Sequence, residues 1–445
     1  MIIRNGAVAL PGRDDLAAID IRIEGEKIAE LGPGLSASGE VIEARGLIIL
    51  PGGIDPHVHF DDPGFTDRED FYHGSSCSAS GGITTVIDMP CTSIPPVTDL
   101  ASLEVKLRAV EKKAVIDYGF FGGICPQSMA SGYPGNFREL SGVVLGFKTY
   151  FISVMELFHS LNHFQFRAVL EQAKEFGATI LLHAEDLSYV AAATDFFMGE
   201  GKTPVYYYRS RPEVVEILAV RSALELQEET GADLHIVHVS TATAAEMIAG
   251  APATCETGPH YLEFDLDDFI RIGSPLKTTP PVKVSGNKEI LWQYLAGGAI
   301  DFAASDHAPS PAPGKETGSI WTDYSGIPGS GTLLPYLFSE GYRKGRLSLR
   351  RLVEVTSENA ARRYGLFPEK GAIKVGTDAD LVLIDPGAAW TVRGSEFLSK
   401  GHVTPFEGMK LQGRISRTIV RGKTVYEDGS GILVGGGYGR FLART

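Results

Sequence analysis

Two histidines separated by one residue close the first long apolar stretch of the sequence. His57 and His59 end the run LIILPGGIDPHVH. On a β-strand, residues i and i+2 point to the same face, so both imidazoles can reach one metal ion. The alternative is a pair of polar residues on a solvated strand face, but the apolar and glycine-rich residues before His57 disfavour it. The pair therefore indicates a metal site.

Further histidines follow other short β-rich runs. His183 comes directly after ATILL, and His238 follows LHIV. A single histidine after a buried strand is often only hydrogen-bonded within a core, so each is a weak signal alone. His235 lies three residues before His238, and strand alternation puts their side chains on opposite faces. We therefore expect His235 to point toward the helices and to be structural.

A lysine and an aspartate could provide oxygen ligands for metal ions beside these imidazoles. Lys148 lies inside the apolar run VVLGFKTYF, and burial lowers the pKa of an unpaired amine. The neutral amine can react with carbon dioxide to give a carbamate, an anionic ligand that bridges two metal ions. The alternative is that the side chain extends to the end of the strand and keeps its charged amine in water. Asp306, in AIDFAASDHAPS, can bind a metal and take a proton from bound water, or it caps a turn. His307 would support it.

The elements that must position these residues form a repeating pattern. Eight short β-rich runs, from LIILPGGIDPHVH to AIDFAASDH, alternate with helical patterns such as HFQFRAVLEQAKEFG and EVVEILAVRSALELQEETG. Gly177 and Gly231 end these two helices. Eight strands alternating with helices predict an α/β fold, a TIM-like (β/α)8 barrel. Active sites of such barrels lie at the C-terminal strand ends, where all six candidate residues fall.

Together these strand ends predict a binuclear metal centre. Two divalent ions held there would activate a bridging hydroxide, a strong nucleophile near neutral pH. Imidazole and oxygen ligands suit zinc best, and manganese, cobalt or iron would also fit. The expected ligands are His57, His59, carboxylated Lys148, His183, His238 and Asp306.

The two ends of the chain have a different pattern. The first 45 or so residues and the last segment, from GTDADLVLIDP onward, read as strands joined by Asn-Gly, Glu-Gly and other glycine turns. We expect one small β-sandwich domain assembled from both termini. The predicted boundaries are 1–50 plus 366–445 for this domain and 51–365 for the hydrolase barrel.

Composition excludes several classes of function. The 445 residues carry a formal net charge of −14, which argues against nucleic acid as a partner. No apolar run is long enough for a membrane helix, and the N-terminus lacks the pattern of a signal peptide, so we expect a cytoplasmic protein. The four cysteines form no CxxC pair, and disulfides are not expected.

Longer stretches resemble the amidohydrolase superfamily, specifically its cyclic amidases: dihydroorotase, allantoinase, hydantoinase and dihydropyrimidinase. The resemblance covers nearly the whole chain in family order. It implies the barrel with a composite β-sandwich, the six metal roles with Lys148 carboxylated, Asp306 as the catalytic proton carrier, a small cyclic amide as substrate, and a homo-oligomer, either a tetramer or a dimer. The matching stretches are PGGIDPHVHF, GGITTVIDMP, GFKTYF, LLHAED, HIVHVSTA, CETGPHYL, TTPPVK, SDHAPS and GAIKVGTDADLVLID.

Within this group, the pattern favours an allantoinase- or hydantoinase-like activity. Asp61, Cys91 and Thr279 stand where similar dihydroorotases carry groups that bind the substrate carboxylate, and an aspartate would repel that anion. Ser153 stands where dihydropyrimidinases carry an oxyanion-binding tyrosine, with Tyr150 nearby. Dihydroorotase or dihydropyrimidinase activity, an acyclic amide or ester hydrolase, and a non-catalytic scaffold are the alternatives. We expect substrate contacts from Ser153, Thr257, Gly258, His260, Asp61, Cys91 and the loop at 326–331.

Overall fold

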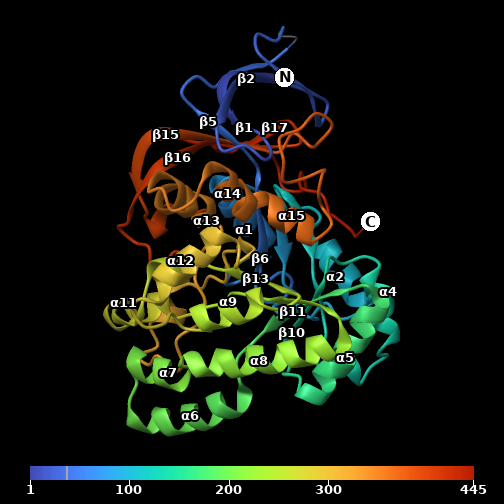
Figure 1. Cartoon of the computed structure of the whole chain (residues 1–445), viewed down its shortest axis with the longest axis vertical. Helices are drawn as coiled ribbons and strands as arrows, with labels where there is room; N and C mark the ends of the chain where they lie inside the picture. The colour runs from blue at the N-terminus through green and yellow to red at the C-terminus, as the bar shows by residue number, and fades with distance from the viewer. Residues whose placement is uncertain (37–38, 445) are drawn as a thin grey trace.

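The computed structural model describes residues 1–36 and 39–444. Figure 1 shows a β-rich region at one end, which contains strands from both chain ends, and a larger region of helices and strands beneath it. Residues 37, 38 and 445 belong to the predicted terminal domain and lie outside the described residues.

Strands from the two chain ends form one nine-stranded sheet. The order is β18-β17-β16-β15-β5-β1-β2-β3, with β4 also paired to β1. β15 runs antiparallel to β5, which joins the C-terminal half to the N-terminal half. Assembly from both ends is therefore as predicted, but hydrogen bonds connect all nine strands, and the described residues form no second separate sheet of a sandwich here. The strands are β1 (Ile2–Ala9), β2 (Leu16–Glu24), β3 (Lys27–Gly32), β4 (Val41–Glu43), β5 (Ile48–Pro51), β15 (Leu381–Thr391), β16 (Lys410–Val420), β17 (Lys423–Glu427) and β18 (Gly431–Ile432).

The run LIILPGGIDPHVH is two strands rather than one. β5 ends at Pro51 in the terminal sheet, and the first parallel strand begins at Gly53. Between them, the Gly52 N–H donates to the Asp380 carbonyl at 2.9 Å. A Cβ at Gly52 would lie only 2.2 Å from Thr84 Oγ1, so this close passage from one sheet to the other requires glycine.

The eight predicted strands of the central region are present and all pair in parallel. They form a three-stranded sheet, β6-β7-β8, and a six-stranded sheet, β14-β13-β12-β11-β10-β9. No continuous ladder closes these sheets into one barrel within the described residues. The third predicted strand is divided at Phe121, and β6 meets the segment after β14 through a parallel bridge between Val58 and His307. The strands are β6 (Gly53–Val58), β7 (Ile83–Asp88), β8 (Asp117–Phe120), β9 (Gly122–Gly123), β10 (Phe147–Tyr150), β11 (Thr179–His183), β12 (Asp233–Ile236), β13 (Ala253–Thr257) and β14 (Phe302–Ala303).

The C-terminal tail pairs with the third strand at Tyr118. Tyr118 donates its N–H to the Arg440 carbonyl at 2.9 Å and accepts from the Leu442 N–H at 2.7 Å. The Phe441 ring packs 5.4 Å from the ring of Phe120. The tail thus covers the edge of β8 at Tyr118, and further along the same edge the Leu145 N–H donates to the Phe120 carbonyl at 3.0 Å.

Helices follow most of the parallel strands, as expected. The two clearest predictions, α5 and α8, end at Gly177 and Gly231, which have φ of 63° and 64°. Among the described helices, none is both long and apolar enough to cross a bilayer. The α-helices are α1 (Phe71–Ser80), α2 (Leu100–Val110), α3 (Pro126–Met129), α4 (Gly135–Ser141), α5 (His163–Phe176), α6 (Leu187–Glu200), α7 (Pro204–Ser210), α8 (Glu213–Thr230), α9 (Ala242–Ala249), α10 (Pro259–Glu263), α11 (Leu266–Ile272), α12 (Asn287–Gly297), α13 (Leu333–Tyr336), α14 (Leu349–Val353) and α15 (Asn359–Arg363).

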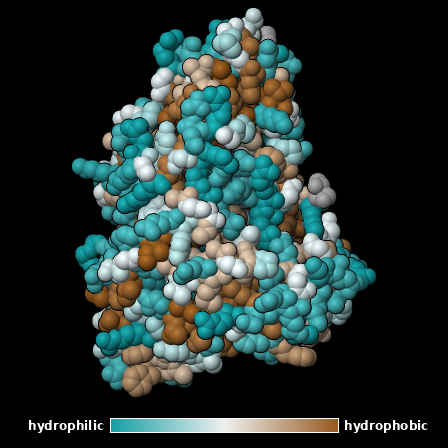
Figure 2. Space-filling view, viewed as in Figure 1, coloured by the Kyte–Doolittle hydropathy of each residue, from teal (hydrophilic) through white to brown (hydrophobic). Residues whose placement is uncertain are grey.

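The face in Figure 2 is mainly hydrophilic, with hydrophobic patches toward the end where Figure 1 draws α6, α7 and α11. Phe196 and Met198 of α6 and Ile270 of α11 are exposed. Large apolar side chains in water mark surfaces that can bind another protein.

Candidate metal centre and active site

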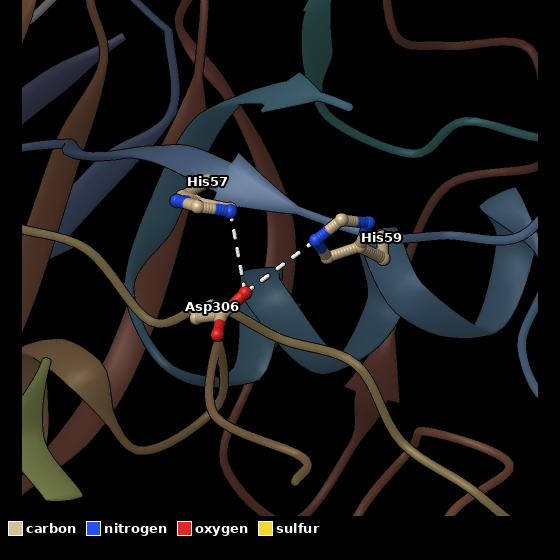
Figure 3. Close-up of side chains that lie close together, drawn as sticks. All are labelled: His57, His59 and Asp306. Atoms are coloured by element: carbon tan, nitrogen blue, oxygen red, sulfur yellow. Dashed lines mark ion pairs between the residues drawn. The ribbon is translucent and has the colours of Figure 1, made fainter. Parts of the chain in front are cut away.

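Three predicted ligands converge where β6 ends beside the segment that follows β14. His57 is in β6, His59 follows it, and Asp306 follows β14. Asp306 Oδ1 lies 3.2 Å from His57 Nε2 and 3.4 Å from His59 Nε2, and both imidazoles point toward this oxygen in Figure 3. One donor atom from each residue lies within 4.8 Å of the others, which is close enough to bind a common cation.

The other two predicted histidines adjoin this group. His183 ends β11 and His238 follows β12, and His183 Nδ1 lies 3.0 Å from His238 Nε2. The rings of His57 and His238 have centroids 5.3 Å apart. Four imidazoles from three strand ends therefore share one buried volume.

Lys148 of β10 completes the set. Its side chain is fully buried, and its Nζ has no hydrogen-bond partner among the described residues. The amine lies 4.8 Å from the centre of the Tyr150 ring. Burial lowers the pKa of Lys148 to about 8, so about a tenth of the amine is neutral and nucleophilic at pH 7.

Three of the four imidazoles favour the neutral form that binds cations; burial alone would lower the pKa of His59, but Asp306 and Cys91 raise it to about 10. Burial lowers the pKa of His57, of His183 and, most strongly, of His238, which favours the neutral imidazole that binds metals. Burial alone would raise the pKa of Asp306, but the neighbouring imidazoles hold it below its usual range. His57 Nε2 and His238 Nδ1, like the lysine amine, have no hydrogen-bond partner among the described residues. Buried unpaired donor atoms are rare unless a ligand uses them, so the set fits a metal centre.

Two buried glutamates, which the sequence analysis did not select, orient the imidazoles. Glu185 accepts a hydrogen bond from His183 Nε2 at 2.8 Å and another from Arg211 at 2.6 Å. Glu256 accepts a short hydrogen bond from His57 Nδ1. Each carboxylate fixes the tautomer that directs the second ring nitrogen into the site. The sequence held a signal for both residues. Glu185 follows His183 by two residues, and Glu256 lies within a strand expected to be buried, where a carboxylate needs a partner.

His235 lies inside the parallel sheets, and the prediction that it points toward the helices is wrong. Its Nε2 lies 3.3 Å from Glu256 Oε2, and its ring stacks on Phe302 with centroids 5.2 Å apart. Strand alternation fails here because β12 ends at Ile236, and His238 lies beyond it with φ of 40°. Both histidines can therefore face the same interior.

Two of the predicted substrate residues use their hydroxyls to build the fold. The buried Thr257 hydroxyl donates to the Val239 carbonyl at 2.8 Å. Ser153 donates to the Phe158 carbonyl at 2.5 Å and accepts from the Met155 N–H at 3.2 Å. These bonds satisfy the two hydroxyls within the chain.

Gly258 and His260 lie close to the centre. A Cβ at Gly258 would lie 2.5 Å from His260 Cε1, so the glycine allows the imidazole to pack there. His260 Nε2 is buried with no hydrogen-bond partner among the described residues. Burial lowers the pKa of His260 to about 4, with opposing influences from the charges of Asp306 and His57. His260 is thus a neutral donor or acceptor beside the metal ligands.

Asp61 and Cys91 flank His59. Asp61 is fully buried and its Oδ2 lies 2.9 Å from Arg68 Nε, so it is not a free negative charge. Burial is the main reason that its pKa rises to about 7. Cys91 Sγ lies 3.0 Å from the Tyr150 hydroxyl and 3.9 Å from His59 Nδ1. Both residues border the centre, and the expectation that they contact substrate stays a prediction.

The loop at 326–331 supports the centre through His307. The N–H groups of Gly329 and Ser330 donate to His307 Nδ1 at 3.1 and 3.2 Å, and His307 Nε2 lies 3.1 Å from Glu69 Oε2. Since His307 follows Asp306 directly, the loop backbone fixes the segment that presents the carboxylate.

The chain belongs to the amidohydrolase family, because the model of that family matches residues 48–425. The chain is 37% identical to an allantoinase of Rubrobacter xylanophilus over 451 aligned positions, which cover 99% of this chain and 97% of the relative. An allantoinase of Enterococcus faecalis is 33% identical, with 97% of each chain covered.

Solved structures of hydantoinases have the same fold. The L-hydantoinase (dihydropyrimidinase) of Arthrobacter aurescens superposes with a TM-score of 0.94 at 33% identity, covering 100% of this chain and 99% of that one. The D-hydantoinase (dihydropyrimidinase) of a Thermus species gives a TM-score of 0.92 at 30% identity, covering 100% and 98%.

Proposed function

We propose that this protein hydrolyses a cyclic amide, opening a five-membered ureide ring such as allantoin or a hydantoin. The observation that carries this function is the convergence of four imidazoles, an unpaired buried amine and a carboxylate on one volume. Full-length similarity to allantoinases and to hydantoinase structures supports the same reaction class.

The residues that would hold two divalent metal ions, with zinc the best fit, are those predicted from the sequence. His57 Nε2 and His59 Nε2 face Asp306, and His183 Nδ1 faces His238. Carbamate formation at Lys148 would give an anionic oxygen ligand between the two groups. When bound, such ions polarise a carbonyl and make water a competent nucleophile near neutral pH.

Asp306 is the proposed catalytic proton carrier. Its pKa lies below the usual range, so its carboxylate is ionised and can accept the proton of the attacking water. The same carboxylate then donates this proton to the ring nitrogen as the C–N bond breaks. Glu185 and Glu256 fix the orientation of the His183 and His57 imidazoles during this transfer.

We also propose that the two parallel sheets work as one closed (β/α)8 barrel, with domain boundaries at 1–50 plus 366–445 and at 51–365. The backbone bond from the His59 N–H to the His307 carbonyl, at 2.8 Å, supports closure at the first strand.

The exposed apolar side chains of α6 support self-association. A homo-oligomer, a tetramer or a dimer, is our proposal for the assembly.

A ring-opening screen tests the function. Metal-loaded protein is given allantoin, hydantoin, dihydrouracil and dihydroorotate in parallel, and the linear carbamoyl product is measured. We expect turnover of the two five-membered rings, and loss of it after metal removal by a chelator. Fast turnover of dihydroorotate alone would contradict the substrate class. Protein that purifies without stoichiometric metal and opens no ring would instead support the non-catalytic scaffold.

A further inference from the structure

Arg68 lies in the loop that leads from the metal ligands of β6 to α1. The Phe65 N–H donates to the Asp61 carbonyl at 2.9 Å, and the Arg68 N–H donates to the Phe65 carbonyl at 3.0 Å. These two turns fold the loop back, so that Arg68 Nε lies 2.9 Å from Asp61 Oδ2. The Asp61 side chain is fully buried, whereas that of Arg68 is 21% exposed, so the guanidinium extends from a buried carboxylate toward solvent.

Two aromatic rings hold the guanidinium in place. Arg68 Cζ lies 4.3 Å from the centre of the Phe65 ring and 5.1 Å from the centre of the Tyr324 ring. Tyr324 belongs to the loop that follows Asp306, and Arg68 belongs to the loop that follows His59. Arg68 therefore lies where the loop after His59 and the loop after Asp306 meet, at the border of the centre.

Most of the donors of this guanidinium remain available. Asp61 Oδ2 lies beside Nε as an ion pair without a hydrogen bond, and a guanidinium carries five N–H donors in a planar fork. Contacts with aromatic faces restrict the orientation of that plane without using its edge donors.

We propose that Arg68 is a specificity residue that binds the substituent of the substrate ring. Its Nη groups donate hydrogen bonds to an acceptor oxygen on the ring carbon substituent, which is a ureido carbonyl in allantoin and a carboxylate in hydantoin-5-acetate. This assignment rests on the proposed function and extends it to the substrate class: five-membered ureide rings with an oxygen-bearing side group. Asp61 acts by orienting Arg68.

The test compares rings that differ only in this substituent. Allantoin and hydantoin-5-acetate carry the acceptor oxygen, and 5-methylhydantoin does not. In Arg68→Met, we expect the ratio of kcat/KM for allantoin to that for 5-methylhydantoin to fall roughly 10- to 100-fold, as for the loss of a hydrogen bond from a charged donor. The ratio for hydantoin-5-acetate should fall at least as far, and Arg68→Lys should give a smaller loss in both.

Arg138→Met is the matched control. Arg138 also pairs with a carboxylate, Glu175, and lies 4.8 Å from the centre of the Phe176 ring, but on α4 and α5 outside the centre. Its ratios should stay at the wild-type value. If Arg68→Met is unstable, Asp61→Asn combined with Arg68→Met removes the uncompensated charge and should give the same fall. Unchanged ratios in variants that still open 5-methylhydantoin would overturn the role of Arg68 and leave the proposed function standing. Wild-type protein that opens none of these rings would overturn the proposed function.

Discussion

At the level of single residues, a lysine amine buried without a partner needs a chemical explanation. Burying an ammonium group costs several kcal/mol unless a counter-charge accompanies it. Lys148 Nζ has no hydrogen-bond partner among the described residues, and the pKa of Lys148 falls to about 8. Lys106, also fully buried, contrasts with it because it pairs with Asp88 and Ser93. The amine of Lys148 is therefore free to become a carbamate ligand.

Replacement of Lys148 by alanine tests this role. We expect Lys148→Ala to lose stoichiometric metal and at least about 10³-fold in kcat/KM, because an anionic oxygen ligand disappears. Acetate or propionate should restore part of the activity by supplying a carboxylate in the vacated space, whereas ethylamine should not. Metal analysis and ring-opening rates measure both effects. Full activity without any added acid would exclude the carbamate.

The convergence of the six candidate ligands could be predicted from the sequence because each directly follows, or lies within, a short apolar run. The partners of these ligands could not. Glu256 bonds to His57 from a strand about two hundred residues away, and Arg68 contacts Asp61 only because two turns fold their loop back. Local patterns identify donor atoms, but the contacts between distant elements decide which second groups orient them.

At the level of elements, a glutamate of β13 connects β13 to β6 and β12. Glu256 of β13 accepts a hydrogen bond from His57 of β6 and approaches His235 of β12 within 3.3 Å. Burial alone would raise the pKa of Glu256, but the two histidines lower it to about 2. The carboxylate therefore remains ionised and links three strand ends beneath the metal centre.

Glu256→Gln keeps the shape of the side chain and removes its charge. We expect metal affinity to fall roughly 10- to 100-fold, the usual effect of losing a carboxylate that orients a ligand histidine. Titration of metal-free protein against a competing chelator measures this change. Glu289→Gln, an exposed substitution on α12, is the control and should leave the affinity at the wild-type value. Equal affinities in both variants would show that Glu256 does not orient His57.

The elements themselves could be predicted in type but not in every boundary. Alternation and helix-stop glycines identify all eight parallel strands and the helices α5 and α8. The pairing of the tail with Tyr118 could not be foreseen, since the two segments lie more than three hundred residues apart in sequence. The orientation of His235 was mispredicted because the end of β12 at Ile236 breaks the alternation.

At the level of the whole molecule, a buried ionic network joins the terminal sheet to the parallel strands. Lys370 Nζ lies 2.6 Å from Asp117 of β8, and 3.0 and 2.7 Å from Asp378 and Asp380, which precede β15. Arg421, which follows β16, also pairs with Asp117. Lys27 Nζ, 2.8 Å from Asp378, is the third cation beside these three aspartates, so this acidic cluster is a structural connection between the two regions.

The pKa shifts in this network define the pH range in which it stabilises the fold. Burial alone would lower the pKa of Lys370, but Asp380 and Asp378 raise it above its ordinary value. Its contribution is therefore complete below about pH 10.4 and is lost as the pH rises through the raised value. Despite burial, Lys370 lowers the pKa of Asp378, so that contribution is complete above about pH 3.9 and is lost as the pH falls through the lowered value.

Lys370→Met should reveal how strongly this connection holds the molecule together. Near neutral pH we expect the free energy of unfolding in urea to fall by about 3–5 kcal/mol, because buried carboxylates lose their counter-charge. The deficit should shrink below about pH 4, where protonation of the carboxyl groups removes the repulsion that the substitution exposes. Arg108→Met, which removes the exposed partner of the exposed Glu104, should cost at most about 1 kcal/mol. A deficit in Lys370→Met that is equally small, or that does not change with pH, would mean that packing rather than charge joins the two regions.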